Sequence, residues 1–501
     1  GNILTSNELG IGVYYAVGSA NTAEVGGKIT TTGDRGQGIT FENSTLNNHN
    51  QTGNITTSGD NAFGIFLLTG GDSNTINMTG NITTSGEGSH GIYSLDSDSN
   101  THTVIGDITT SGDNARGLFI KRSNSNTINM TGNITTTSDG AYGMRLNDSD
   151  SNNITINGNI TTSGTDGDSE AIFINNSDSN TISLSGSVQA LGGDDQAIYI
   201  SANSDANTFI IESGATFLGD LENLGTNTVI TNQGVMDGIE NAGSIATFNN
   251  AQTGATYSGT LPVNYNIIIN SPTGYGSTTF STATGTTTFG LDTVNSTGIS
   301  GGYYSDILSG LGTPPLLTAV EGNTGSRYWE IIDSDSDNTL DLNLSYVGNQ
   351  TITSDISYTK NGAYGFWMKE NDSSTISINA DITTTGSNAI GFYSESSDSN
   401  TTNLTGNITT TGDCAYGMRL NGSDSNDIMI TGNITTSGSD GDSEAIFINN
   451  SDSNTITLSG SVQALGGDDQ AIYINTGSDA NTFIIESGAT FLGDFENLGT
   501  N

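Results

Sequence analysis

The chain has 501 residues, and its 53 acidic and 10 basic side chains give a formal net charge of −43 at pH 7. Binding to nucleic acid or to an anionic membrane draws on clusters of Lys and Arg, so this charge argues against both classes of partner. The single cysteine, Cys414, excludes an internal disulfide and a cysteine-based metal site.

No apolar run approaches the roughly 18 residues of a membrane span, so we expect no direct membrane insertion by this segment. The chain begins at Gly1, without an initiator Met or a signal-peptide pattern. We therefore interpret it as a processed or excised piece of a longer protein.

A six-residue phrase recurs along the chain, for example NITTSG at 54–59, 81–86 and 159–164. Its second position returns at a nearly constant spacing, at Ile3, Ile29, Ile55, Ile82, Ile108, Ile134, Ile160 and Val188 and later at Ile356, Ile382, Ile408, Ile434 and Val462. Each repeat holds three short β-type runs separated by turn residues, and none has helical periodicity. The pattern predicts an all-β chain, a right-handed parallel β-helix with three-strand rungs of about 26 residues.

A longer period is superimposed, because residues 139–227 recur almost unchanged at 413–501, an offset of 274. We expect the chain to be part of a longer tandem array, cut inside a unit. Where the short period fails, LENLG at 221 and IENAG at 239 predict narrower rungs of about 18 residues. Residues 261–347 read as longer strands divided by Gly and Pro turns. The predicted organisation is a first β-helix over 1–260, an antiparallel β module over 261–347 that caps it and joins it to the next, and a second β-helix over 348–501.

In most rungs a G-Φ-x-Φ run places two apolar residues, such as Ile65 and Leu67, on one face of a strand, which predicts that they point inward. The residue between them then faces outward. We name the resulting series the aromatic column, and it comprises Tyr14, Phe66, Tyr93, Phe119, Arg145, Phe173 and Tyr199, then Trp367, Tyr393, Arg419, Phe447 and Tyr473, with Thr40 in one early rung. Such a column favours a recognition or assembly surface, since aromatic faces stack on sugars or on another protein. The alternatives are cover by a loop, or an inverted assignment in which these rings form core.

An asparagine closes the DSDSN-type turn in most rungs, and stacked amides are expected to hydrogen-bond along the axis. This predicted Asn ladder comprises Asn48, Asn74, Asn100, Asn126, Asn152, Asn180 and Asn207, and Asn400, Asn426, Asn454 and Asn481. An aspartate often lies two places earlier, at Asp72, Asp98, Asp150, Asp178, Asp372, Asp398, Asp424 and Asp452. Carboxylates stacked about 4.8 Å apart are candidate calcium ligands, and exposed acidic turns are the alternative. No known calcium-binding motif in the sequence supports the calcium interpretation.

Catalysis finds little support in the sequence. The chain has three histidines, and we interpret His90 and His102, which fall in one rung, as surface residues. No hydrolase or metalloprotease motif occurs, and no carboxylate pair stands out among so many acidic residues. We therefore predict a protein that is not an enzyme and that needs no cofactor, with calcium as the one candidate ion.

LPVNYNIIINSPTGYG at 261–276, GTTTFGL at 285–291 and the Gly-, Asn- and Thr-rich rungs resemble passenger regions of bacterial autotransporter-type (type V secreted) proteins. There, similar strands commonly precede an outer-membrane barrel, whereas here a new β-helix begins after Val347. The resemblance implies export by a Gram-negative bacterium and an extracellular structural role as adhesin, surface fibre or matrix component. The expected partners are further copies of the chain or a cell-surface or glycan receptor. The alternative is a glycan-binding or glycan-processing β-helix such as a phage tailspike, which would need a groove with clustered carboxylates beside the aromatic column.

Overall fold

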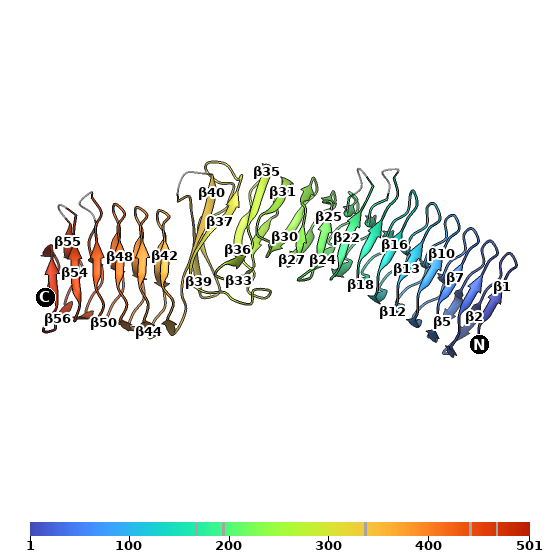
Figure 1. Cartoon of the computed structure of the whole chain (residues 1–501), viewed down its shortest axis with the longest axis horizontal. Coiled ribbons are helices and arrows are strands. Elements are labelled where there is room, and N and C mark those ends of the chain that lie inside the picture. Colours follow the sequence, from blue (N-terminus) through green and yellow to red (C-terminus); the bar gives the residue numbers. More distant parts are fainter. Residues whose placement is uncertain (166–168, 193–195, 335–337, 440–442, 467–468, 501) are drawn as a thin grey trace. The chain divides into compact units, whose positions relative to one another are not determined.

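A computed structural model describes residues 1–165, 169–192, 196–334, 338–439, 443–466 and 469–500. Every regular element in these residues is a β-strand, which confirms the predicted fold class (Figure 1). The described part of the chain holds no helix that is long and apolar enough to cross a membrane. Contacts divide the chain into unit 1, residues 1–268 with 276–289, and unit 2, residues 269–275 with 290–501. Each unit contains a parallel β-helix.

Unit 1 is built from three parallel sheets, and most rungs contribute one strand to each sheet. The first sheet holds, in order, β1 (Ile3–Thr5), β4 (Ile29–Thr31), β7 (Ile55–Thr57), β10 (Ile82–Thr84), β13 (Ile108–Thr110), β16 (Ile134–Thr136), β19 (Ile160–Thr162), β22 (Ser187–Ala190), β25 (Thr216–Leu218) and β28 (Val235–Met236). The second holds β2 (Val13–Ser19), β5 (Ile39–Thr45), β8 (Ile65–Leu68), β11 (Ile92–Leu95), β14 (Leu118–Lys121), β17 (Met144–Asn147), β20 (Ile172–Asn175), β23 (Ile198–Ile200), β26 (Leu221–Asn223), β29 (Ile239–Asn241), β31 (Ala255–Thr260) and β35 (Thr278–Thr284). The third holds β3 (Thr22–Val25), β6 (Asn48–Thr52), β9 (Thr75–Thr79), β12 (Thr101–Ile105), β15 (Thr127–Thr131), β18 (Asn153–Asn157), β21 (Thr181–Leu184), β24 (Thr208–Ile211), β27 (Thr228–Asn232), β30 (Ile245–Asn250), β32 (Asn264–Ile267) and β36 (Thr288–Leu291).

The core of each rung follows from the repeated phrase. Ile82 of β10 pairs in register with Ile55 and Ile108, and all three side chains are buried. The glycine that precedes the phrase has a steric cause: Gly106 has φ +148°, and a Cβ there would lie 2.2 Å from the carbonyl oxygen of Gly80 in the preceding rung. A side chain at this corner would push the rungs apart, so glycine recurs there.

The narrower rungs predicted near 221 and 239 are confirmed. Leu221 pairs with Ile239, and Ile239 pairs with Tyr257, so successive rungs are shorter here than those before them. The predicted boundary at residue 260 is wrong, however. Strand β32 pairs parallel with β30, and β35 pairs parallel with β31, so the first β-helix continues through the first part of the segment assigned to the antiparallel module, as far as β36. Longer strands and Gly-rich turns do not distinguish these wider rungs from a hairpin sheet.

Unit 2 contains three further parallel sheets. Their strands are β41 (Gln350–Ile352), β44 (Thr375–Ile378), β47 (Thr401–Leu404), β50 (Asp427–Ile430), β53 (Thr455–Leu458) and β56 (Thr482–Ile485); β42 (Ile356–Tyr358), β45 (Ile382–Thr384), β48 (Ile408–Thr410), β51 (Ile434–Thr436), β54 (Ser461–Ala464) and β57 (Thr490–Leu492); and β43 (Tyr364–Lys369), β46 (Ile390–Glu395), β49 (Tyr416–Asn421), β52 (Ile446–Asn449), β55 (Gln470–Ile474) and β58 (Asp494–Asn497).

The antiparallel part is confined to a hairpin, β33 (Ile269–Ser271) with β34 (Gly274–Tyr275), and to the strands β37 (Gly302–Ser309), β40 (Thr339–Leu344), β39 (Arg327–Ile332) and β38 (Glu321–Thr324), which pair in that order. We expected this module to cap the first β-helix and to join it to the next. Its described contacts within unit 2 are with the second: the Tyr346 ring stacks on Phe366 at 4.5 Å, and Asn343 Oδ1 accepts a hydrogen bond from the Tyr364 backbone N–H at 3.1 Å. The module therefore covers the start of the second core.

Candidate functional site

The aromatic column lies on the outside of the strands that carry it. In β8 the side chains of Ile65 and Leu67 are fully buried, whereas Phe66 between them is partly exposed. The same alternation holds in β20 and β52, where the partly exposed Phe173 and Phe447 lie between buried isoleucines. These rings therefore point outward, as the alternation of a strand requires.

Consecutive members of the column stack on one another. In unit 1 the ring centroids of Phe66 and Tyr93 are 5.2 Å apart, and those of Tyr93 and Phe119 are 4.8 Å apart. The Arg145 guanidinium lies 5.8 Å from the Phe119 ring and 4.9 Å from the Phe173 ring. Tyr199 continues the stack at 5.3 Å from Phe173. Arginine therefore replaces a ring without breaking the stack, because its planar cation is attracted to the aromatic faces on both sides.

The column in unit 2 repeats this arrangement. Trp367 and Tyr393 are nearly parallel at 6.5 Å, and Phe447 and Tyr473 stack at 5.5 Å. Arg419 bridges the two pairs, 5.4 Å from the Tyr393 ring and 5.6 Å from the Phe447 ring. Tyr93, Phe119, Trp367 and Tyr393 are buried, and the other rings of the column are partly or largely exposed.

The first member, Tyr14, is 49% exposed, and its hydroxyl hydrogen-bonds to Glu42. In the next rung Thr40 replaces the aromatic residue. Because the threonine side chain is small, a groove of about 410 Å³ opens between Tyr14 and Phe66, with Leu9 and Leu68 in its walls. The column is therefore interrupted once in unit 1, near its beginning.

A second column, which sequence reasoning missed, lies beside the first, three residues earlier in each rung. In unit 1 it includes Phe63, His90, Arg116 and Tyr142. Phe63 stacks on His90 at 5.1 Å, and the Arg116 guanidinium lies 4.6 Å from the Phe119 ring. Its members differ in residue type from rung to rung, so no repeated letter reveals the position. The spacing from the aromatic column is the only signal.

The interpretation of His90 and His102 as surface residues is wrong. His90 is 5% exposed within the second column, and burial together with Arg116 and Arg145 holds its pKa well below the usual range. His102 is fully buried in the third sheet, in register with Ile76 and Ile128, and burial lowers its pKa to about 4. The imidazole of His102 therefore occupies a position that neighbouring rungs fill with isoleucine.

The Asn side chains form a continuous ladder. The backbone N–H of Asn126 donates to Asn152 Oδ1 at 2.9 Å, and the backbone N–H of Asn152 donates to Asn180 Oδ1 at 2.9 Å. The same bond joins the remaining predicted members from Asn74 to Asn207 and from Asn400 to Asn481. Each amide thus satisfies a backbone donor at a turn, where the strand ladder cannot.

One predicted ladder member is wrong. Asn48 is the first residue of β6 and pairs with Thr75, whereas the buried Asn47 occupies the ladder position. The Asn47 backbone N–H donates to Asn74 Oδ1 at 2.9 Å, and Asn47 Oδ1 accepts from the Asn21 backbone N–H at 3.0 Å. Asn47 and Asn74 are 27 residues apart in the sequence, whereas Asn21 and Asn47 are 26 apart. The run NNHN also offers two adjacent asparagines for the one ladder position.

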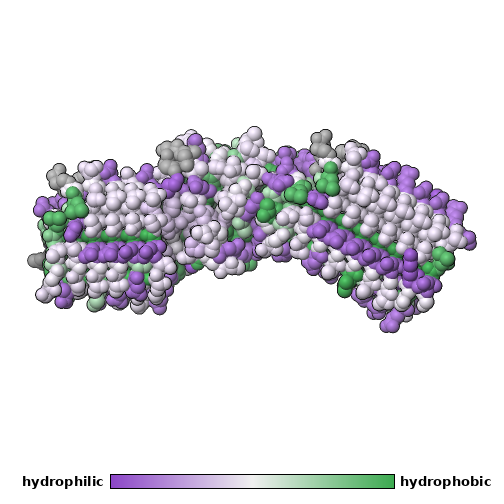
Figure 2. Space-filling view, in the orientation of Figure 1, coloured by the Kyte–Doolittle hydropathy of each residue, from purple (hydrophilic) through white to green (hydrophobic). Residues whose placement is uncertain are grey.

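The aspartates form a second ladder of opposite direction. Asp72 Oδ1 accepts a hydrogen bond from the Asp98 backbone N–H at 2.8 Å, and Asp98 Oδ1 accepts from the Asn124 backbone N–H at 2.6 Å. Asn124 then accepts from the Asp150 backbone N–H at 2.7 Å, so an uncharged amide serves equally at this position. The bond recurs at Asp178 and, in unit 2, at Asp372, Asp398, Asp424 and Asp452. Figure 2 shows that residues of like hydropathy form rows across successive rungs, in purple for hydrophilic residues and green for hydrophobic ones.

Calcium at these turns stays a prediction. Within the described residues no three His, Cys, Asp or Glu side chains lie close enough together to hold a metal ion. In the structure these aspartates accept hydrogen bonds from backbone N–H groups of the next rung, and the negative charge of the carboxylate strengthens such bonds.

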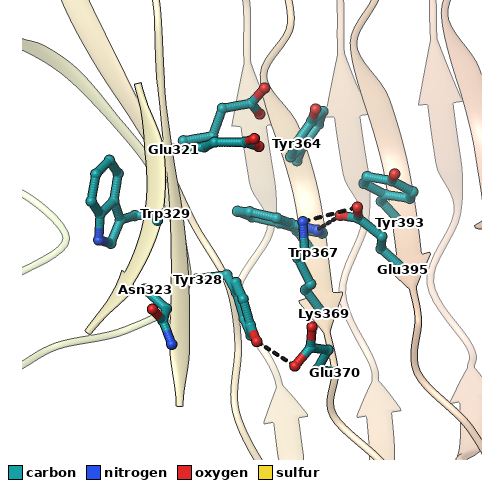
Figure 3. A pocket seen from close by; sticks show the side chains of 12 residues that line it. Glu321, Asn323, Tyr328, Trp329, Tyr364, Trp367, Lys369, Glu370, Tyr393 and Glu395 are labelled. Carbon is teal, nitrogen blue, oxygen red and sulfur yellow. Dashed lines mark hydrogen bonds and ion pairs between the residues drawn. The ribbon is translucent and has the colours of Figure 1, made fainter. Parts of the chain in front are cut away.

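A cavity lies in unit 2, where the hairpin of β38 and β39 faces the first rungs of the aromatic column of that unit. Its volume is about 500 Å³. Figure 3 shows Trp367, Tyr364 and Tyr393 on the β-helix side and Tyr328 and Glu321 on the hairpin side. This groove combines carboxylates with column rings, the arrangement that the sequence analysis expects of a glycan-binding or glycan-processing β-helix. No sequence motif indicated it, because its two walls come from segments that are far apart in the chain.

Comparison with protein-family models finds no match, and comparison with curated proteins finds none either. Among solved structures, a chain of "The cryo-EM structure of the Vag8-C1 inhibitor complex" aligns with 97% of this chain and 100% of its own length, at 11% sequence identity and a TM-score of 0.22. The assignment of the chain as a parallel β-helix therefore rests on the strand pairing described above.

Proposed function

We propose that the chain is a non-enzymatic, extracellular structural protein of a Gram-negative bacterial surface, which acts as an adhesin, surface fibre or matrix component and associates with further copies of itself. The autotransporter-type resemblance of residues 261–291 supports the location, and the β-helical rungs support the structural role.

The observation that carries the proposal is the continuity of side-chain contacts from rung to rung. The Asn ladder, the Asp ladder and the aromatic column each join successive rungs outside the backbone ladder. These contacts resist bending and shear between rungs, so each β-helix is a stiff rod. Stiffness of this kind suits a protein that projects from or spaces a surface.

Association is proposed on the basis of charge and repetition. A net charge of −43 keeps copies apart at low ionic strength, and salt screens this repulsion within about 10 Å at 0.1 M. The polar and aromatic rows recur at most of the 26-residue rungs, so two rods that match over one such rung match over many. Association is therefore expected to rise steeply with salt.

Electron microscopy of the native material, together with sedimentation velocity at 0.02 M and 0.5 M NaCl, tests this proposal. We expect fibres or bundles in the micrographs and a shift to larger species at the higher salt. Isolated monomers in the micrographs and at both salt concentrations would contradict the fibre and matrix forms of the proposal.

A further inference from the structure

The cavity between the β38–β39 hairpin and the aromatic column of unit 2 has the chemistry of a ligand site. Its rings are Tyr328, Trp329, Tyr364, Trp367 and Tyr393, and its charged side chains are Glu321, Glu330, Glu370, Glu395 and Lys369. Its volume of about 500 Å³ lies in the usual range for small-molecule pockets. All these residues belong to unit 2.

Two of the carboxylates face each other in an unfavourable way. Glu321 of β38 and Glu330 of β39 are direct partners across the antiparallel pair. Like charges at such positions destabilise a hairpin, since their side chains project from the same face about 5 Å apart. Burial raises the pKa of Glu330, with Glu321 as a further contributor, and this outweighs the opposite effect of hydrogen bonds from Tyr364 and Asn343. A cation bound between the two carboxylates would remove this repulsion.

Lys369, Glu370 and Glu395 are also engaged with the walls. Lys369 Nζ lies 3.0 Å from Glu395 Oε1, and Trp367 Nε1 donates to Glu395 Oε2 at 3.2 Å. The Tyr328 hydroxyl donates to Glu370. Four carboxylates against one ammonium leave the cavity strongly negative, and the excess lies on the side of Glu321 and Glu330.

The walls already hold one ammonium group in the way that a ligand would be held. Lys369 Nζ lies 5.4 Å from the centre of the Tyr328 ring and 6.0 Å from that of Trp367, while a carboxylate completes its surroundings. Two rungs further along the column, the Arg419 guanidinium lies 5.4 Å from Tyr393. Rings and carboxylates together stabilise a cation more than either does alone, because the rings add attraction and exclude water.

A neutral sugar fits less well. Stacking of a pyranose requires a broad exposed ring face, and Trp367 and Tyr393 are only 4% and 6% exposed. A neutral ligand would also leave the repulsion between Glu321 and Glu330 in place. An anionic ligand is excluded by the same carboxylates.

We propose that this cavity binds an organic cation, a protonated amine or a guanidinium, which lies against the Tyr364 ring and between the carboxylates of Glu321 and Glu330. The group can come from a free polyamine or from a Lys or Arg side chain of a basic partner. This binding is independent of self-association, so neither proposal depends on the other.

Intrinsic fluorescence is the assay of choice, because the chain has two tryptophans and both, Trp329 and Trp367, line this cavity. The full chain is titrated with spermidine, with a short arginine-containing peptide, with NaCl at matched ionic strength and with a neutral oligosaccharide. We expect a saturable change with spermidine, the peptide or both, and none with the other two. Saturation by spermidine identifies a polyamine site, and saturation by the peptide alone identifies a side-chain site.

Three variants locate the binding. Glu321→Gln, on the exposed edge strand, is expected to weaken binding about tenfold, since it removes one of the two facing carboxylates. Lys369→Met removes the competing ammonium and is expected to strengthen binding severalfold. Glu24→Gln, an exposed carboxylate in unit 1, is the matched control and is expected to change nothing. Far-UV circular dichroism verifies that each variant is folded.

The proposal is overturned if no cation produces a saturable change, or if the oligosaccharide does so and the cations do not. It is also overturned if Glu321→Gln and Glu24→Gln weaken binding equally, because the effect would then come from the overall charge. Self-association is measured on the same samples by sedimentation, so the loss of one property is seen separately from the loss of the other.

Discussion

Removal of one rung of the Asn ladder is the most direct test of what holds the β-helix together. Asn152 is 1% exposed, and its Oδ1 accepts from the backbone N–H of Asn126 at 2.9 Å and from Asn126 Nδ2 at 3.1 Å. Its own Nδ2 donates to Asn180 Oδ1 at 3.0 Å. Asn152→Ala removes all three bonds and leaves the Asn126 backbone N–H buried without an acceptor.

The magnitude follows from which partners keep a second bond. Asn180 Oδ1 still accepts from the residue 152 backbone N–H, and Asn126 Nδ2 still donates to Ser97 O at 3.3 Å. A buried, unsatisfied backbone N–H costs about 1–3 kcal/mol, and the lost side-chain bonds bring the total to about 2–4 kcal/mol. Asn153→Ala is the matched control, because Asn153 is exposed and adjacent, and its cost is expected to stay within about 0.5 kcal/mol.

Urea unfolding gives the stability difference, and hydrogen exchange of residues 124–128 gives a local measure, which matters because repeat proteins often unfold in parts. We expect the Asn126 amide to lose protection in Asn152→Ala and to keep it in Asn153→Ala. Equal costs for the two variants, or unchanged exchange at Asn126, would refute a structural role of the ladder.

Four further outcomes are expected. Phe173→Ala should lower the free energy of unfolding by about 1.5–3 kcal/mol. Phe173→Leu should lower it by less, because leucine keeps apolar area but loses the stacking. Urea titration of both variants checks this, and equal costs would count against a contribution from the stack. The folded pKa of His102 is about 4, below its unfolded value near 6.5, so its contribution to stability, up to about 3 kcal/mol, is present above pH 6.5 and is lost as the pH falls toward 4. His102→Ile should remove that loss, measured as urea midpoints at pH 7 and 4.5, and an unchanged loss would contradict it. Asp98→Asn should leave the free energy of unfolding unchanged, while Asp98→Ala should lower it by about 1 kcal/mol. If a chelator lowers the melting temperature of the unaltered chain but not that of the Asp98 variants, calcium binding is favoured instead. Cation binding should weaken as the pH falls through the raised pKa of Glu330, because the protonated acid no longer attracts the ligand, and a pH-independent affinity between pH 7.5 and 5 would argue against its part in the site.

The sequence was sufficient to predict the rungs because a residue that points inward must do so in every rung. Ile82 pairs with Ile55 and Ile108, and the period of the letters is the period of the structure. The assignment of Asn48 failed where that rule is locally ambiguous. Two adjacent asparagines and a lengthened step to the next rung allow two registers, and only the buried position of Asn47 distinguishes them.

The second column and the cavity could not be predicted for different physical reasons. Positions such as Phe63, His90 and Arg116 share a place in the rung but no residue type, so their neighbour relation exists only in three dimensions. The cavity requires the β38–β39 hairpin to lie against strands β43 and β46. That packing depends on contacts such as Tyr346 on Phe366, and a periodic search does not register a contact that occurs once.

The few basic residues of this acidic chain show where its negative charge is balanced. Arg116, Arg145, Lys369 and Arg419, four of the ten, lie over aromatic rings of the column or its neighbour. An exposed ion pair contributes little, since water and salt screen it, whereas a cation between rings is partly desolvated and keeps its attraction. These four cations are therefore placed where rings hold them. Among the described residues, rings and surplus carboxylates meet in the cavity at the start of the aromatic column of unit 2. An external cation would meet there the same surroundings that the chain provides for its own.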